Sequence, residues 1–231
     1  MTQNEDKGIR IAVDAVVFAY SKDAGISVLL IKRKYPPYKG SRALPGGFVL
    51  EDESLEEAVQ RELQEETGIG VNYLEQLYTF GAPERDSRSR VISVAYFALV
   101  KSSMFQKLQA GTDAEDAQWF SIKKLPALAF DHKVILQAAI ERVRAKVRYQ
   151  PIGFELLDKK FSFPDLEKMY AALLDKELDR RNFTKKILSL GLLEDTGELA
   201  PAAGAGRPGK VYQFNKKRYQ QLLKEGMHFE I

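Results

Sequence analysis

The chain contains 231 residues, with no cysteine, two histidines and a formal net charge of +3. The lack of cysteine excludes disulfides and thiolate metal sites, and two histidines are too few for a histidine-rich metal site. No stretch approaches the roughly 20 apolar residues that span a bilayer, and the N-terminus has no apolar leader. We therefore expect a cytoplasmic protein without membrane contact, in which any bound cation relies on carboxylates.

The first part of the chain mixes strands and helices. Five segments rich in β-branched and aromatic residues predict strands, at 9–20, 26–32, 71–80, 91–100 and 117–122. Two segments have helical periodicity, at 54–67, where Gly68 follows, and at 131–147. This order predicts an α/β (α+β) sandwich with a mixed sheet around one core.

A second domain is expected after Gln150-Pro151, because a proline disfavours helix at the residue before it. We predict domains at 1–150 and 151–231. Ser162 is a suitable N-cap for a helix to about residue 176, and Asp179 for a second helix that ends at Gly191. A hairpin follows, with strands at 192–194 and 210–214 and a long polar loop between them. Helix, turn, helix and hairpin is the order of a winged helix-turn-helix.

The helix at 54–67 and the segment before it are rich in acidic residues. A solvated acidic face is the ordinary explanation of such a run. The helical wheel argues against it, because Glu62 and Glu66 fall within the apolar stripe and Glu65 lies at its edge. Carboxylates at apolar positions are costly unless a cation neutralises them.

A glycine-containing loop, Leu44-Pro45-Gly46-Gly47, precedes this helix and allows backbone to approach a ligand closely. Together with the three acids it predicts a site for a metal-bound phosphate. Other polar residues can contact such a ligand or equally be ordinary surface charges: Lys32, Arg33, Arg42, Glu84, Asp86, Arg88 and Arg90.

The same region resembles the complete Nudix box: Gly47, five residues, Glu53, seven residues, then Arg61-Glu62-Leu63-Gln64-Glu65-Glu66-Thr67-Gly68-Ile69. The resemblance implies that Glu62, Glu65 and Glu66 ligate Mg²⁺ or Mn²⁺, with assistance from Glu53, and that Arg61 orients the acids. In an active enzyme Arg61, Glu62, Glu65 and Glu66 would be the catalytic residues. Nudix enzymes hydrolyse nucleoside diphosphates linked to another group, and the box itself does not define the substrate.

The segment from Asp179 to Arg218 is basic, with nine Lys and Arg residues against four acids. On its predicted second helix, Arg181, Asn182, Lys185 and Ser189 lie opposite the apolar face, where they suit a major groove, with Lys186 beside them. Arg207 and Lys210 lie in the predicted wing and can reach the DNA backbone or a minor groove. A P-loop is excluded there, because Val211 replaces the required Ser or Thr and a strand follows.

A Nudix box followed by this module resembles the Nudix-related transcriptional regulators called the NrtR family. The resemblance implies a homodimer that binds a double-stranded DNA operator and responds to a small effector, either ADP-ribose-like or a sugar such as arabinose. Such sensors often lose box residues, whereas this chain keeps them, so a metal-dependent hydrolase of ADP-ribose or a related compound is the alternative. A protein-interaction adaptor is disfavoured by the charged face around Arg181 and Lys185.

Overall fold

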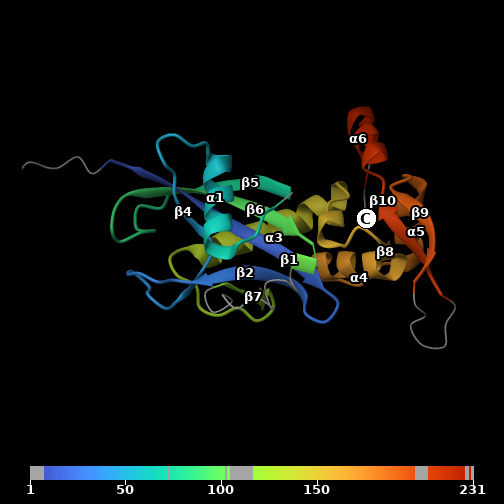
Figure 1. Ribbon diagram of the computed structural model, residues 1–231, viewed down its shortest axis with the longest axis horizontal. Helices are drawn as coiled ribbons and strands as arrows, with labels where there is room; N and C mark the ends of the chain where they lie inside the picture. Colours follow the sequence, from blue (N-terminus) through green and yellow to red (C-terminus); the bar gives the residue numbers. More distant parts are fainter. Residues whose placement is uncertain are drawn as a thin grey trace, which may run out of the picture.

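The computed structural model describes residues 8–71, 73–101, 103–104, 117–200, 208–226 and 229. Figure 1 shows an elongated molecule with a large sheet and two covering helices at one end and a smaller helical part with a hairpin at the other. Among the described residues, none of the helices has the length and apolar character needed to cross a membrane.

The large sheet is mixed, as predicted. Its main path runs β3-β2-β1-β6-β5, with β4 paired to β1 and β7 paired to β2. Only the central β1–β6 pair is parallel among the pairs recorded in this sheet. The strands are β1 (Arg10–Ser21), β2 (Gly25–Lys32), β3 (Arg42–Ala43), β4 (Gly46–Phe48), β5 (Tyr73–Phe80), β6 (Val91–Val100) and β7 (Ala117–Ser121).

Two helices cover opposite faces of this sheet, α1 (Leu55–Thr67) and α3 (His132–Tyr149). Side chains alternate between the faces along β1, so that Val17 packs on the α1 side and Phe18 on the α3 side. The sandwich is confirmed, but the expectation of one core is wrong. The sheet separates two apolar clusters, because both faces of its central strands are buried.

The C-terminal part has the helix, helix and hairpin order of a winged helix. It contains η1 (Phe154–Leu156), β8 (Phe161–Ser162), α4 (Phe163–Leu174), α5 (Arg180–Ser189), β9 (Leu193–Leu199), β10 (Lys210–Phe214) and α6 (Lys216–Glu225). Ser162 forms a capping box with Asp165 at the start of α4, and the carboxylate of Asp179 accepts from the first amides of α5. The three strands pair in the order β8-β10-β9.

The two parts share one apolar cluster. The cluster on the α3 side of the large sheet continues through Phe154 of η1 and Leu166, Tyr170 and Leu173 of α4 into the winged helix. The hydroxyl of Tyr170 donates to the carbonyl oxygen of Ile152 at 3.0 Å. The predicted division after residue 150 coincides with the C-cap of α3, but the buried apolar packing does not stop there.

Ion pairs also join α4 to the large sheet and to α3. Lys22 contacts Asp165 at 2.7 Å, and Asp175 accepts from both Lys123 at 2.9 Å and Arg144 at 3.0 Å. These partly exposed pairs add to the contacts that the shared cluster makes between α4 and the first part. The orientation of the winged helix is therefore defined by contacts and not by the peptide connection alone.

Several elements differ from the sequence-based predictions. The predicted polar loop of the hairpin is shorter than expected, because β9 continues to Leu199 and pairs with β10 up to Lys210. The short strands β3, β4 and β8 and the helix α6 were not predicted. The three strands are too short to show a period of their own and exist because longer strands pair with them.

Candidate functional site

The glycine loop and the start of α1 are held together by backbone and capping contacts. Ser54 and Glu57 form the capping box of α1. At Gly47, a Cβ atom would lie 2.1 Å from Oε1 of Glu62, so only glycine lets this carboxylate lie against the chain. At Gly46, φ is 156° and a Cβ would lie 2.2 Å from the carbonyl oxygen of Val13. The loop therefore brings backbone directly against the acids of the helix.

Arg61 binds three of the acids of the box. It makes two hydrogen bonds to Glu53, at 2.7 and 2.9 Å, and one to Glu62 at 2.7 Å, with a longer contact of 3.4 Å to Glu65. The bond from Arg61 and the amide of Leu50 lower the pKa of Glu53 to about 2. Glu53 is therefore a carboxylate throughout the physiological range, and the guanidinium carries the countercharge of the group.

Glu66 is placed differently from its neighbours. It is half-buried and accepts a hydrogen bond from the amide of Gly46 at 2.9 Å. Burial raises its pKa to about 7, against the lowering effect of that hydrogen bond. The wheel prediction is confirmed here, because the side chain of Glu62 is 14% exposed and that of Glu65 is 61% exposed.

The donor chemistry of these acids fits Mg²⁺ or Mn²⁺, which prefer carboxylate oxygens. In the described part of the chain, no three acidic or histidine side chains already converge as a metal-ligand group. The acids are instead neutralised in part by Arg61. Glu62 and Glu66, from adjacent turns of α1 beside the glycine loop, are the residues best placed to turn toward an incoming cation.

A buried polar network under the glycine loop was not predicted. Arg85 binds Asp131 at 2.8 and 2.9 Å and Asp14 at 3.2 Å. Asp14 also accepts from the hydroxyl of Ser93 and lies 3.4 Å from Nε2 of His132. The residues come from β1, the β5–β6 loop, β6 and the start of α3. The only hint in the sequence was Asp14 itself, a charge within an apolar strand.

His132 connects this network to the glycine loop. Its Nδ1 accepts a hydrogen bond from the amide of Leu44 at 2.8 Å, so the ring proton lies on Nε2, toward Asp14. Burial lowers the pKa of His132 and keeps the imidazole neutral. The loop that contacts the acids is thereby tied to the N-terminus of α3.

Two of the polar residues predicted to contact a ligand lie on the face of the sheet opposite the acids. Lys32 and Arg42 are cross-strand neighbours, and the alternation with Ile31 and Ala43, which pack on the α1 side, directs them to the other face. Arg42 donates to Gln118 at 2.6 Å and lies over the ring of Phe120. Glu84 is exposed in the β5–β6 loop.

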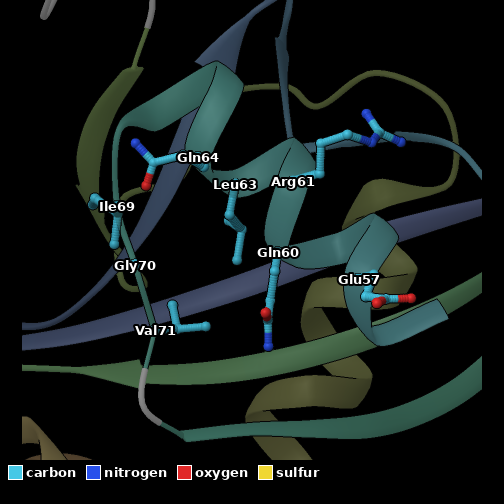
Figure 2. A pocket seen from close by; sticks show the side chains of 8 residues that line it. All are labelled: Glu57, Gln60, Arg61, Leu63, Gln64, Ile69, Gly70 and Val71. Carbon is cyan, nitrogen blue, oxygen red and sulfur yellow. The ribbon is translucent and has the colours of Figure 1, made fainter. Parts of the chain in front are cut away.

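A separate hollow of about 420 Å³ lies beside α1 and the segment that follows it. Its lining residues are Glu57, Gln60, Arg61, Leu63, Gln64, Ile69, Gly70 and Val71 (Figure 2). In this view the side chain of Arg61 extends away from Gln64 and Ile69. Glu62 and Glu66 do not line the hollow, and the charged tips of Glu57 and Arg61 already bind other groups. It therefore lacks the convergent charges that a phosphate site needs.

The second helix of the winged helix, α5, has the orientation that its pattern predicted. Phe183 and Ile187 are buried, while Arg181, Asn182, Lys185 and Ser189 are exposed and Lys186 is half-buried. The amide of Asn182 donates to Asp179 at 2.9 Å, and the hydroxyl of Ser189 donates to the carbonyl oxygen of Lys186. Arg181 and Lys185 have no recorded side-chain partner in the described residues, so they are the most available cations on this face.

The wing is described only in part. Lys210 opens β10 and pairs with Asp195 of β9 at 2.7 Å, on an exposed surface. Arg207 lies outside the described residues. Unlike Arg181 and Lys185, Lys210 is therefore already paired with a carboxylate of its own hairpin.

Comparison with known families agrees with both parts of this description. Residues 8–139 match the NUDIX domain, and residues 153–214 match the NrtR DNA-binding winged helix domain. The fold, the box and the hairpin-bearing helix pair thus define a Nudix protein with a DNA-binding winged helix. The chain belongs to the NrtR family of Nudix-related transcriptional regulators.

One relative matches nearly the whole chain, and another matches about half of it. The ADPR responsive transcriptional repressor NtrR of Acinetobacter baylyi is 34% identical over 95% of this chain and 89% of its own length. The ADP-ribose pyrophosphatase of Methanocaldococcus jannaschii is 43% identical over 55% of this chain and 70% of its own length.

One solved structure matches nearly the whole chain, and another matches about three fifths of it. The crystal structure of Shewanella oneidensis NrtR complexed with a 27mer DNA has a TM-score of 0.81 at 34% identity, over 91% of this chain and 95% of that one. The NUDIX domain of the same protein, complexed with ADP ribose, has a TM-score of 0.51 at 36% identity, over 62% of this chain and 99% of that one.

Proposed function

We propose that this protein is a transcriptional repressor that binds operator DNA through its winged helix and responds to ADP-ribose bound by its Nudix part. The observation that carries the proposal is the combination, in one chain, of a glycine loop against a carboxylate helix with an exposed basic recognition helix. The two parts are joined by a shared apolar cluster. A relative that matches nearly the whole chain is an ADP-ribose-responsive repressor.

We narrow the proposed effector class to ADP-ribose-like nucleotides. Both the full-length relative and the solved Nudix domain described above are associated with ADP-ribose by name. Nothing in these comparisons supports arabinose. An ADP-ribose-like nucleotide also suits the chemistry of the site, because a divalent cation held by the acids of α1 would match a diphosphate.

On the Nudix side, we assign metal binding to Glu53, Glu62, Glu65 and Glu66, with Arg61 as the residue that orients them. When bound, Mg²⁺ or Mn²⁺ would polarise phosphoryl oxygens and activate water. Arg61 donates hydrogen bonds to Glu53 and Glu62, and Gly47 lets the backbone lie directly against the carboxylate of Glu62.

On the DNA side, Arg181 and Lys185 are assigned to base and phosphate contacts, with Asn182, Lys186 and Ser189 beside them on α5. The wing residues Arg207 and Lys210 would reach the backbone or the minor groove. Asn182 must release Asp179 before it can use both amide hydrogens on a base. Arg181 therefore has the largest expected share of base recognition.

We also propose a cytoplasmic homodimer with domains at 1–150 and 151–231. A symmetric dimer would bind an inverted repeat with half-sites about one helical turn apart, roughly 10 base pairs, or a multiple of that. Sedimentation of the protein alone and with operator DNA tests this. A protein that stays monomeric in both states would contradict the dimer.

The test of the regulatory function is a binding titration on genomic promoter fragments, by fluorescence anisotropy, with and without ADP-ribose. We expect specific binding to a small set of fragments and a shift in the DNA dissociation constant when ADP-ribose is added. Ribose and arabinose at equal concentration serve as controls. The absence of sequence-specific DNA binding would contradict the proposal. So would the same change in DNA affinity with ADP-ribose, ribose and arabinose.

Hydrolysis of ADP-ribose is the second candidate function, favoured by the complete box and by the identity to an ADP-ribose pyrophosphatase. Release of AMP from ADP-ribose in the presence of Mn²⁺ measures it directly. Turnover at about 1 per second or faster would establish an enzyme, since this is within the usual range of kcat. Turnover that is absent in wild type leaves the regulatory function as the role of the Nudix part.

A further inference from the structure

A cluster of two arginines and two aromatic rings lies beside the glycine loop. The guanidinium carbons of Arg33, which follows β2, and Arg88, from the β5–β6 loop, lie 4.7 Å and 5.7 Å from the centroid of the Phe130 ring. The ring of Tyr38 meets the same Phe130 ring edge-on at 4.9 Å. We call these four residues the arginine–aromatic cluster. From the sequence, Arg33 and Arg88 were candidates either for ligand contacts or for ordinary surface charges.

The charges of this cluster are not balanced from within. Arg88 is paired with Asp86 at 2.7 Å, whereas Arg33 donates to the carbonyl oxygens of Pro37 and Tyr35. Among the described residues, no ion pair of Arg33 with a carboxylate is recorded. Burial and, after it, the proximity of Arg88 lower the pKa of Arg33. The carboxylates of Asp86, Glu66 and Asp14 act on the pKa of Arg33 in the opposite direction, but none of them is recorded as its direct hydrogen-bond partner.

The backbone of the cluster is also unusual. Three non-glycine residues in the described chain have positive φ, and two of them are Tyr38 at 63° and Phe130 at 51°. Such conformations are disfavoured for aromatic residues and gather at ligand sites where surrounding contacts impose them. Contacts on both sides of Phe130 restrain its backbone. The amide of Ala129 donates to the carbonyl oxygen of Arg42, and Arg85 donates to the carboxylate of Asp131.

The cluster borders the carboxylate site without being part of it. Arg33 is close enough to Glu66 and Asp14 for their charges to raise its pKa. Arg88 lies 5.9 Å from the ring of Phe48, which ends the strand that begins at Gly46. A phosphate between the two arginines would therefore lie next to the glycine loop. The Nη1 group of each arginine has no recorded hydrogen bond to the described residues and is available to it.

We propose that Arg33 and Arg88, positioned by Phe130, bind the diphosphate of the effector and make its recognition independent of a divalent cation. Guanidinium groups bind phosphate oxygens by charge-assisted hydrogen bonds and supply the countercharge that a metal ion would otherwise supply. This inference rests on the proposed ADP-ribose response. Sensing would then use the arginines, whereas any hydrolysis would use the carboxylates of α1.

The experiment is calorimetric titration of ADP-ribose and of pyrophosphate into the full-length protein, in excess EDTA and again in Mg²⁺. The variants are Arg33→Gln and Arg88→Gln, each of which removes one charge. The matched control is Arg148→Gln, which removes an exposed charge near the end of α3. Arg88 is partly exposed in a loop, so its variant should fold even if Arg33→Gln does not. Thermal melting of each variant checks this.

We expect wild type to bind ADP-ribose in EDTA with nearly the affinity measured in Mg²⁺. Each cluster variant should weaken binding of both ADP-ribose and pyrophosphate by about tenfold or more, the usual effect of losing a hydrogen bond to a charged group, and the control should not. Wild-type binding that requires Mg²⁺, or a folded Arg88→Gln that binds like wild type, overturns the inference but not the ADP-ribose response. Failure of wild type to bind ADP-ribose under either condition overturns the proposed function itself.

Discussion

Charged side chains at the Nudix end of the molecule are bound to one another, whereas those on α5 of the winged helix are exposed to solvent. Arg85 and Arg61 each hold two or more carboxylates, and the glycine loop is tied to His132. On α5, Arg181 and Lys185 extend from a helix whose other face is buried. Precise small-molecule geometry requires such mutual support, while a DNA surface keeps its cations free for phosphates and bases.

This difference predicts that substitutions at the two ends have different consequences. In the buried network they should lower stability and ligand binding together. On α5 they should alter DNA binding with little effect on stability.

The largest expected effect is at Arg85. Arg85→Met leaves the carboxylates of Asp14 and Asp131 without their guanidinium partner in a buried setting, which should cost about 3–5 kcal/mol. The melting temperature should fall by roughly 6–20 °C for a chain of this size. Differential scanning fluorimetry measures it. Arg148→Gln, an exposed substitution, should melt like wild type, and an equal fall in both variants would contradict the assigned role of Arg85.

The next effect concerns the acids of α1. The double substitution Glu65→Gln and Glu66→Gln should weaken Mn²⁺ binding by at least about tenfold, because two carboxylate donors are removed. The fold should persist, since neither residue belongs to an apolar cluster. Calorimetry with Mn²⁺ gives the affinity, and operator binding by the same preparation is the control. Unchanged Mn²⁺ affinity would remove these two residues from the metal site.

On α5, Arg181 and Lys185 should differ in kind. Arg181→Ala should cost roughly 1–3 kcal/mol of operator binding and relax specificity at one base position. Lys185→Ala should weaken specific and scrambled duplexes alike and lower the slope of log K against log salt by roughly 1. Titrations of both duplexes at three salt concentrations distinguish the two outcomes. If both variants bind like the parent, α5 does not enter the groove.

The smallest effect is expected where the two parts meet. Bonds from Lys123 and Arg144 lower the pKa of Asp175, so its contribution to stability is present above the carboxyl's unfolded pKa and is lost as the pH falls through the lower, folded one. Because this carboxylate is exposed, Asp175→Asn should lower stability at pH 7 by at most about 1 kcal/mol. Urea titrations at pH 7 and at about pH 2.5 measure both values. A difference from wild type that persists undiminished in acid would contradict the ion-pair explanation.

The helix α1 shows how much of the site a local sequence pattern can predict. The period of α1 placed Glu62 and Glu66 within its apolar stripe, and the structure has both partly buried, with Glu65 exposed. The same reasoning predicted the buried and exposed faces of α5. Both succeeded because a helix repeats at a known angle, so the residues it buries follow from spacing alone. The spacing did not show that the sheet directs Lys32 and Arg42 to the face opposite the acids, and their contact with a ligand stays a prediction.

What the sequence by itself determined was therefore the local order: the longer strands, the helices α1, α3, α4 and α5, the box and the helix-helix-hairpin of the winged helix. The pairing of Asp14 with Arg85, 71 residues later, and of Leu44 with His132, 88 residues later, depended on the tertiary structure. So did the meeting of Arg33, Arg88 and Phe130 around one ring. Such contacts carry no periodic signal, because they depend on which strand ends and loops the folded sheet brings together.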